Sequence, residues 1–288
     1  NRSADRTNEY EGRMEDHHRE FVVGAILSWC AWTLVYNIAP FINGRFLPRK
    51  MYRNLVGVSS DGAATVEEKK KANREIVDWD SKLPTFLHSV FAGALATYCC
   101  FFDKSLMADK IAGTSFAWKL TTWNTVGFFI WDFILHFRYQ KIFGMPMLLH
   151  AVLGLATYTI CGTSKETPMA WHACSLLLFE LTTPVMIARI CAIKLSGSKA
   201  AVQAMTNLFG LSFFVIRMVW GNFYAFPQIW SVLLTGGRLP AWKVMGFWIM
   251  TFLSAGLNTY WMYRLGRRIF GSRGGKKEQK RRDKSKTS

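Results

Sequence analysis

Two ionisable side chains stand four residues apart in one of the most apolar stretches of the chain. Residues 128–137 read FFIWDFILHF, so Asp132 and His136 interrupt eight apolar residues. A spacing of four places both side chains on one face of a helix, about one turn apart. A carboxylate can orient a neighbouring imidazole or keep it protonated, and general acid–base catalysis uses such pairs. Asp132 and His136 are therefore candidates for catalysis or ligand binding.

Further polar side chains lie in other apolar stretches, where each needs a partner or water. His150 follows the short segment KIFGMP, which predicts that it lies on the antiparallel neighbour of the helix carrying Asp132. We expect Asp132 to bond to His150 or Arg217, and His136 to be partly hydrated at the membrane surface. Glu180 and Arg217 are expected to pair with one another or with Asp132. The predicted ligand-binding set is His88, Asp132, His150, Glu180, Arg217 and Asn258, and the catalytic candidates are His150, Asp132 and His136.

The elements that carry these residues are long apolar blocks. Half of the 288 residues are hydrophobic, and the blocks have the length of about 20 residues that a helix needs to cross a bilayer. The seven blocks cover residues 21–43, 83–102, 116–137, 145–162, 169–193, 204–234 and 241–265. The sixth is longer than one span, and Pro227 is expected to kink or end its helix. The pattern predicts an all-α, polytopic membrane protein with about seven transmembrane helices.

The distribution of Lys and Arg predicts the orientation of these helices. With seven spans, one side of the membrane receives 24 Lys and Arg residues and the other receives 9. The cytosolic side carries the excess of positive charge, so the N-terminus is expected outside and the basic tail in the cytosol or matrix. The net charge of +17 therefore indicates topology and contact with anionic headgroups. No aromatic or fold motif accompanies the charge, and no nucleic-acid partner is expected.

Neither a metal nor a cofactor is expected. The six cysteines lie inside or at the rim of apolar blocks and show no CxxC spacing, so they indicate neither a zinc site nor a disulfide framework. No glycine-rich nucleotide-binding loop is present in the sequence.

The charge and hydropathy patterns divide the chain into five parts. They are a polar N-terminal arm (1–20), a first transmembrane helix (21–43), a basic interfacial loop (44–82), a six-helix membrane domain (83–268) and a basic C-terminal tail (269–288). The ending KSKTS has lysines third and fifth from the end, a dilysine pattern that favours the endoplasmic reticulum. The first residue, Asn1, leaves open a processed presequence, so a mitochondrial or other organellar membrane is the alternative.

Six segments resemble the TLC-domain family when taken in order. They are LPTFLHSVFAGALATY, GFFIWDFIL, LLHAVLGLATY, LFELTTPVMIARI, NLFGLSFFVIRMVW and GLNTYWMYRL, within residues 80–268. The family includes ceramide synthases, translocation-associated membrane proteins and lipid-homeostasis proteins. The resemblance implies a six-helix membrane barrel, preceded by an extra helix, that encloses a tunnel for a lipid chain.

The sequence departs from the ceramide synthases at the positions that matter for their chemistry. Their paired histidine corresponds here to Leu149 and His150, and Glu180 in ELTTP stands where they carry two aspartates. The resemblance is therefore closer to the branch of the family that does not make ceramide.

Three functions remain open. The favoured one is a barrel that binds membrane lipid and serves lipid homeostasis without catalysis. The second is a structural subunit that joins other membrane-protein subunits in a larger complex. The third is an acyl-CoA-dependent lipid N- or O-acyltransferase, in which His150 acts with Asp132 or His136.

Overall fold

The computed structural model describes residues 2–46, 66–195, 198–235 and 238–286, and these residues contain helices and no strand. The α-helices are α1 (Arg2–Phe46), α3 (Val66–Asp80), α4 (Lys82–Phe101), α5 (Lys104–Ala108), α6 (Phe116–Arg138), α7 (Gln140–Phe143), α8 (Met145–Thr163), α9 (Ala170–Leu177), α10 (Thr182–Leu195), α11 (Lys199–Phe213), α12 (Phe226–Thr235) and α13 (Ala241–Lys286). A 3₁₀ turn, η1 (Leu178–Leu181), joins α9 to α10, and a π-helix, η2 (Phe214–Ala225), joins α11 to α12.

Five helical stretches within the described ranges are long and apolar enough to cross a membrane. They are Glu11–Gly44, Asn73–Phe101, Met145–Thr163, Ala170–Leu195 and Lys199–Thr235. The long helices α6 and α13 complete the bundle, and polar residues such as Asp132 and Asn258 lower their hydropathy. The chain is an all-α, multi-pass membrane protein, as predicted.

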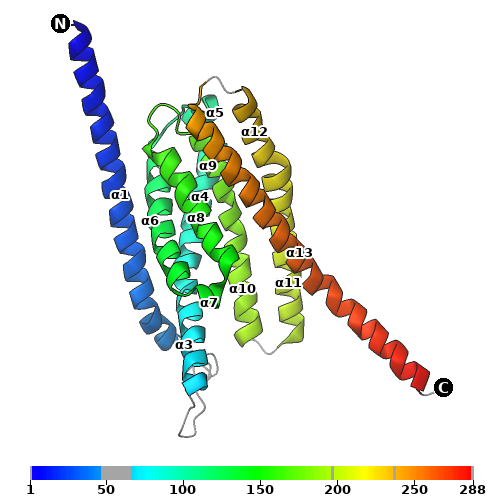
Figure 1. Cartoon of the computed structure of the whole chain (residues 1–288). Coiled ribbons are helices and arrows are strands. Elements are labelled where there is room, and N and C mark those ends of the chain that lie inside the picture. The colour runs from blue at the N-terminus through cyan, green and yellow to red at the C-terminus, as the bar shows by residue number, and fades with distance from the viewer. Residues whose placement is uncertain (1, 47–65, 196–197, 236–237, 287–288) are drawn as a thin grey trace.

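Six of the long helical units form a closed ring. Helix α4 packs on α6, α6 packs on α8, and α8 packs on α13. Helix α13 packs on the continuous helix formed by α11, η2 and α12. This continuous helix packs on the α9–α10 helix, which contacts α4 and closes the ring. Helix α1 lies outside the ring along α6 (Figure 1). The two helices approach closely at Gly127, where an added Cβ would lie 2.5 Å from Ser28. The barrel and the external first helix therefore agree with the architecture predicted above.

The sixth apolar block is one continuous helical stretch, Lys199–Thr235, so Pro227 does not end the helix; the helix changes from π to α directly before it. Residues Phe214–Ala225 are π-helical, and α12 then continues to Thr235 with Pro227 at its second position. The wider turn of a π-helix changes which backbone N–H groups have partners. We infer that this lets the chain accept a residue without an N–H group at that point. Pro227 therefore does not end the span.

The described ends of the chain lie at opposite ends of the bundle (Figure 1). Helix α1 begins at Arg2, so residue 20 is not an element boundary, and α13 continues as a helix through the basic tail to Lys286. Of the region 44–82, residues 47–65 lie outside the described ranges, while the charged run EEKKKANRE lies in α3.

Candidate functional site

A cavity of about 450 Å³ lies inside the ring, near the end of the bundle that carries α7. Helices α4, α6, α8, α10, α11 and α13 and the π-helix all contribute to its wall. Its lining includes the apolar side chains Phe128, Leu135, Phe143, Met147, Met186, Phe209, Phe213, Trp261 and Leu265, and the polar side chains Lys82, Asp132, His136, His150, Glu180, Thr182, Thr183, Arg189, Arg217, Tyr260 and Arg264. The described chain thus gathers groups from most of its membrane helices around one space.

Asp132 and His136 are partners of one another. The His136 Nδ1 atom lies 3.1 Å from Asp132 Oδ1 and 2.9 Å from the Asp132 carbonyl oxygen. Both residues line the cavity, yet only 5% and 4% of their surfaces are exposed. His136 is buried rather than exposed at the membrane surface as expected, since the ring of Phe143 covers it edge-on at 4.5 Å between ring centroids.

The predicted bond from Asp132 to a neighbouring helix is also absent from the described contacts. His136, four residues further along the same helix, lies within ion-pair distance of the Asp132 carboxylate, and the described ion pairs of Asp132 include neither His150 nor Arg217.

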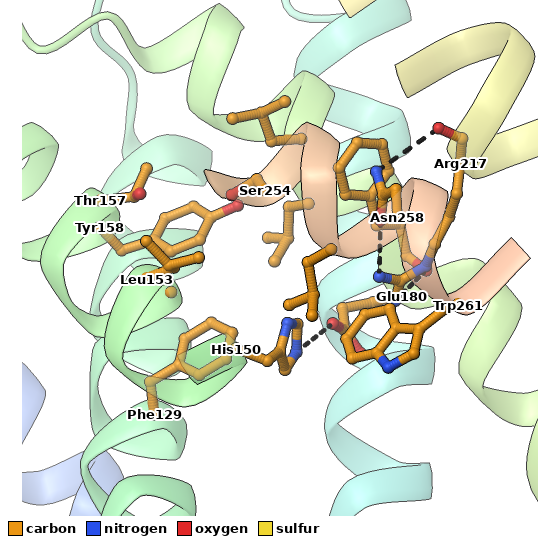
Figure 2. Close-up of a pocket in the computed structure, with 15 residues that line it drawn as sticks. Phe129, His150, Leu153, Thr157, Tyr158, Glu180, Arg217, Ser254, Asn258 and Trp261 are labelled. Carbon is orange, nitrogen blue, oxygen red and sulfur yellow. Dashed lines mark hydrogen bonds and ion pairs between the residues drawn. The ribbon is translucent and has the colours of Figure 1, made fainter. Parts of the chain in front are cut away.

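His150 instead faces Glu180 across the cavity. Its Nε2 lies 3.9 Å from Glu180 Oε1, and Thr183 Oγ1 donates to Glu180 Oε2 at 3.1 Å. The His150 side chain is 25% exposed, whereas that of Glu180 is 8% exposed. Figure 2 shows the imidazole and the carboxylate pointing toward one another. The imidazole is thus the accessible member of a histidine–carboxylate pair, which could accept a proton from a bound ligand.

Arg217 crosslinks three elements from its place on the π-helix. It donates to Thr182 Oγ1 at 3.2 Å, to the Phe179 carbonyl at 3.3 Å and to Asn258 Oδ1 at 3.4 Å. Asn258 returns a bond to the Arg217 carbonyl at 3.5 Å (Figure 2). Contrary to expectation, the described hydrogen bonds of Arg217 go to neutral oxygens, and the described ion pairs include none between Arg217 and Glu180.

A smaller cavity of about 60 Å³ lies beside the large one and shares His150, Glu180, Arg217 and Trp261 with it. Its other lining residues are Phe129, Leu153, Gly154, Thr157, Tyr158, Leu176, Leu177, Phe179, Ser254, Leu257 and Asn258. A space of this size is enough for about two water molecules, given roughly 30 Å³ for each in the liquid. Figure 2 shows that Thr157 and Tyr158 approach it from the α8 side. The two cavities are therefore adjacent, with polar groups in the wall that they share.

His88 lies outside both cavities. It is fully buried between α4 and α6, where its ring stacks on Phe128 at 3.7 Å and its Nδ1 lies 3.2 Å from Asn124 Nδ2. His172 is also buried, and neither of its ring nitrogens has a hydrogen-bond partner among the described residues. Asn258 lines only the smaller cavity. The six predicted ligand-binding residues thus separate into five at the cavities and one in the packed core.

Three cationic residues of the cavity lining were not among the ligand-binding residues predicted from the sequence: Lys82, Arg189 and Arg264. Lys82 and Arg264 fall at the ends of apolar blocks, where basic residues usually report topology. Arg189 in VMIARI could have been found, because it interrupts an apolar block. No group of three or more His, Cys, Asp or Glu residues suited to a metal ion occurs in the part of the chain described.

A comparison with known protein families shows to which family the chain belongs. The TLC-domain family model matches residues 78–267, about two thirds of the chain. The chain belongs to the TLC-domain family. The matched range begins before α4 and ends in α13, so it contains all six units of the ring and leaves α1 outside.

Its relatives are also TLC-domain proteins. TLC domain-containing protein 4-B of Xenopus laevis is 26% identical over 208 residues, which cover 69% of this chain and 76% of the relative. An uncharacterised TLC domain-containing protein of Schizosaccharomyces pombe is 25% identical over 199 residues, 68% of this chain and 67% of the relative. Topoisomerase I damage affected protein 4 of Saccharomyces cerevisiae is 24% identical over 150 residues, covering 49% and 52%. No solved structure gives a significant match.

Proposed function

We propose that this TLC-domain protein binds a membrane lipid inside its barrel and serves lipid homeostasis in the membrane of the endoplasmic reticulum, without catalysis. The observation that carries the proposal is the cavity of about 450 Å³ among its helices. Ligand sites in proteins usually occupy roughly 300–1,000 Å³ and combine apolar walls with a few polar groups. The phenylalanine, leucine and methionine side chains of the lining suit an acyl chain, and the polar groups suit a headgroup or a chain end.

The test is to purify the full chain in detergent, extract its lipids and identify them by mass spectrometry. Met186→Trp should reduce the bound lipid several-fold, because the larger side chain fills part of the cavity. Ile193→Trp is the matched control, since Ile193 lies on the same helix with 48% of its surface exposed. Absence of any stoichiometric lipid from the unmodified protein would end the proposal, and so would equal losses in the two variants.

Acyl transfer is the second candidate, because His150 faces both the cavity and Glu180. An imidazole of this kind could deprotonate an amine or a hydroxyl that attacks an acyl thioester. The neighbouring pair of Asp132 and His136 is already closed on itself. Leu149 occupies the position that a second histidine holds in the ceramide synthases that the chain resembles, and this favours binding over transfer.

An acyl-CoA turnover assay with sphingoid bases and lipid alcohols as acceptors separates the two candidates. We expect no turnover by the unmodified protein. Turnover that disappears in His150→Ala, while the variant keeps its unfolding midpoint, would replace the binding proposal with catalysis.

A further inference from the structure

We propose that the lipid carries an anionic headgroup, a phosphate or a carboxylate, which is held at the α7 end of the cavity while its chain extends inward. This inference rests on the proposed function and specifies the ligand of the same site. It is carried by a set of cations in the cavity wall, Lys82, Arg189 and Arg264, here called the basic mouth.

The three residues of the basic mouth lie on three different helices. Lys82 is the first residue of α4, and Arg189 lies six residues before the end of α10, about 9 Å along the helix axis. Arg264 lies on α13, three residues beyond Trp261, which lines both cavities. These positions place the three cations toward the α7 end, together with the apolar Phe143 and Leu265, while Arg217 and Trp261 line the wall shared with the smaller cavity.

Neighbouring groups hold each cation in place. Lys82 Nζ lies 2.6 Å from Asp78 Oδ1, and Arg189 Nε donates to Thr206 Oγ1 at 3.0 Å. Arg264 Nη1 donates to the Tyr260 hydroxyl at 3.0 Å, and that hydroxyl also lies on the cavity wall. A guanidinium group has five N–H donors in a planar fork. Arg264 therefore keeps donors for a ligand while its position is fixed by a neutral group.

The charges of the lining favour an anion over a cation. Four permanent cations line the cavity, Lys82, Arg189, Arg217 and Arg264, against two carboxylates, Asp132 and Glu180. Asp132 is within ion-pair distance of His136, and Glu180 faces His150. Asp78, which does not line the cavity, is the ion-pair partner of Lys82. A cavity wall of one predominant sign with low-dielectric surroundings concentrates the opposite charge.

The geometry of the donors suits a phosphate or carboxylate in particular. Arginine binds these planar or tetrahedral oxyanions through paired N–H groups, and such charged hydrogen bonds are stronger than neutral ones. A lipid amine would need a carboxylate that is not already engaged, and both carboxylates of the lining face histidines. An uncharged headgroup would offer no counter-charge to Arg264, whose described hydrogen-bond partner is the neutral hydroxyl of Tyr260.

The experiment measures binding to the full-length protein in neutral nanodiscs, with phosphatidic acid and phosphatidylcholine of identical acyl chains as probes. Oleate and oleyl alcohol form a second pair that differs only in the carboxylate, and inorganic phosphate is the soluble competitor. We expect the anionic member of each pair to bind at least about tenfold more tightly, since charge-assisted hydrogen bonds add this much or more. Inorganic phosphate at the same concentration should not displace phosphatidic acid.

Arg264→Gln should weaken phosphatidic acid binding by about tenfold, the loss of one such interaction. Arg267→Gln is the matched control. Arg267 is exposed on the same helix, carries the same charge, does not line the cavity and stacks over Tyr263 at 5.9 Å. Arg264→Lys should recover part of the affinity, because it restores the charge without the fork.

Several results would overturn the inference. They are equal binding of both members in each lipid pair, equal losses in Arg264→Gln and Arg267→Gln, and displacement of the lipid by inorganic phosphate. The last would identify a soluble anion as the ligand. Binding without headgroup preference would leave the proposed lipid function intact. Absence of binding by every lipid would instead end the proposed function itself.

Discussion

The buried pair of Asp132 and His136 satisfies itself within one helix. Each side chain is almost completely buried, and the carboxylate and imidazole are 3.1 Å apart. A buried ionisable group that loses its partner is strongly destabilising, whereas removal of both members costs less. The pair therefore fixes two polar groups in an apolar environment, while His150 is left accessible to the cavity.

Asp132→Ala and His136→Ala are each expected to lower the free energy of unfolding by about 1–3 kcal/mol, because each leaves a buried group unsatisfied. The double variant should cost less than the sum of the two single changes, since the interaction is lost only once. The measurement is a double-mutant cycle of equilibrium unfolding in detergent. Additive losses would mean that the two side chains do not interact.

At the scale of elements, the π-helix from Phe214 to Ala225 determines where Arg217 lies. Twelve π-helical residues lie between α11 and α12, and segments of this kind often occur at functional sites. The same segment brings Gly221 against Phe179, at the 3₁₀ turn that leads into α10. An added Cβ at Gly221 would lie 2.6 Å from the Phe179 ring, and Phe179 also gives its carbonyl to Arg217.

Gly221→Ala should therefore destabilise the protein by about 1–3 kcal/mol, the usual effect of excess volume in a packed core. Gly256→Ala, on α13, is the control, because an added Cβ there meets nothing within 4 Å. That change should be neutral or stabilise the helix by up to about 1 kcal/mol. Unfolding midpoints in one detergent test both variants. An equally small effect of the two changes would show that Phe179 moves aside freely.

At the scale of the whole molecule, a surface ion pair joins two connections at the end of the bundle opposite α7. Arg238 precedes α13, and its Nη2 lies 2.9 Å from Asp109 Oδ2 in the segment that follows α5. The backbone N–H groups of Ile111 and Ala112 donate to Asp109 Oδ1 at 2.9 Å each. The bond from Arg238 and these two N–H groups lower the pKa of Asp109 from 3.8 to about 2.

A carboxyl group whose pKa is lower in the folded state stabilises that state above its unfolded pKa. This contribution is lost as the pH falls from about 3.8 through about 2. Asp109→Asn should lower the unfolding midpoint slightly at pH 7, and less in high salt because the pair is exposed. The difference from the unmodified protein should shrink as the pH falls below about 3.8 and disappear below about 2. A difference that is independent of pH would assign the effect to the backbone contacts rather than to the charge.

The orientation of the chain is also a property of the whole molecule. The two described ends lie at opposite ends of the bundle (Figure 1). This arrangement is expected for an odd number of spans, which the distribution of Lys and Arg among the loops also favours. Accessibility of tags at the two termini in sealed membrane vesicles should therefore differ. The C-terminal tag should be digested by protease from the cytosolic side, and the N-terminal tag should be protected. Digestion of both tags from one side would contradict this topology.

The sequence by itself determined the helical class, the approximate number of spans and the family. These depend on local properties: the length of each apolar block, the basic residues that flank it and the order of short family segments. It also indicated that Asp132, His150, Glu180 and Arg217 face the interior, because an ionisable side chain facing lipid is costly. Each of these four residues lines the large cavity.

Only the tertiary structure decided which polar groups are partners. The contact of His136 with Asp132 agrees with their spacing of four residues. Glu180, however, faces His150, and Arg217 bonds to neutral oxygens, whereas the sequence predicted other partners for them. His88 has the same polar character as His150 but packs against Phe128 outside the cavities. Such assignments depend on the rotation of each helix about its axis, on its offset along its neighbour and on the π-helical segment. These quantities are set by packing between residues far apart in the chain, so hydropathy and spacing do not contain them.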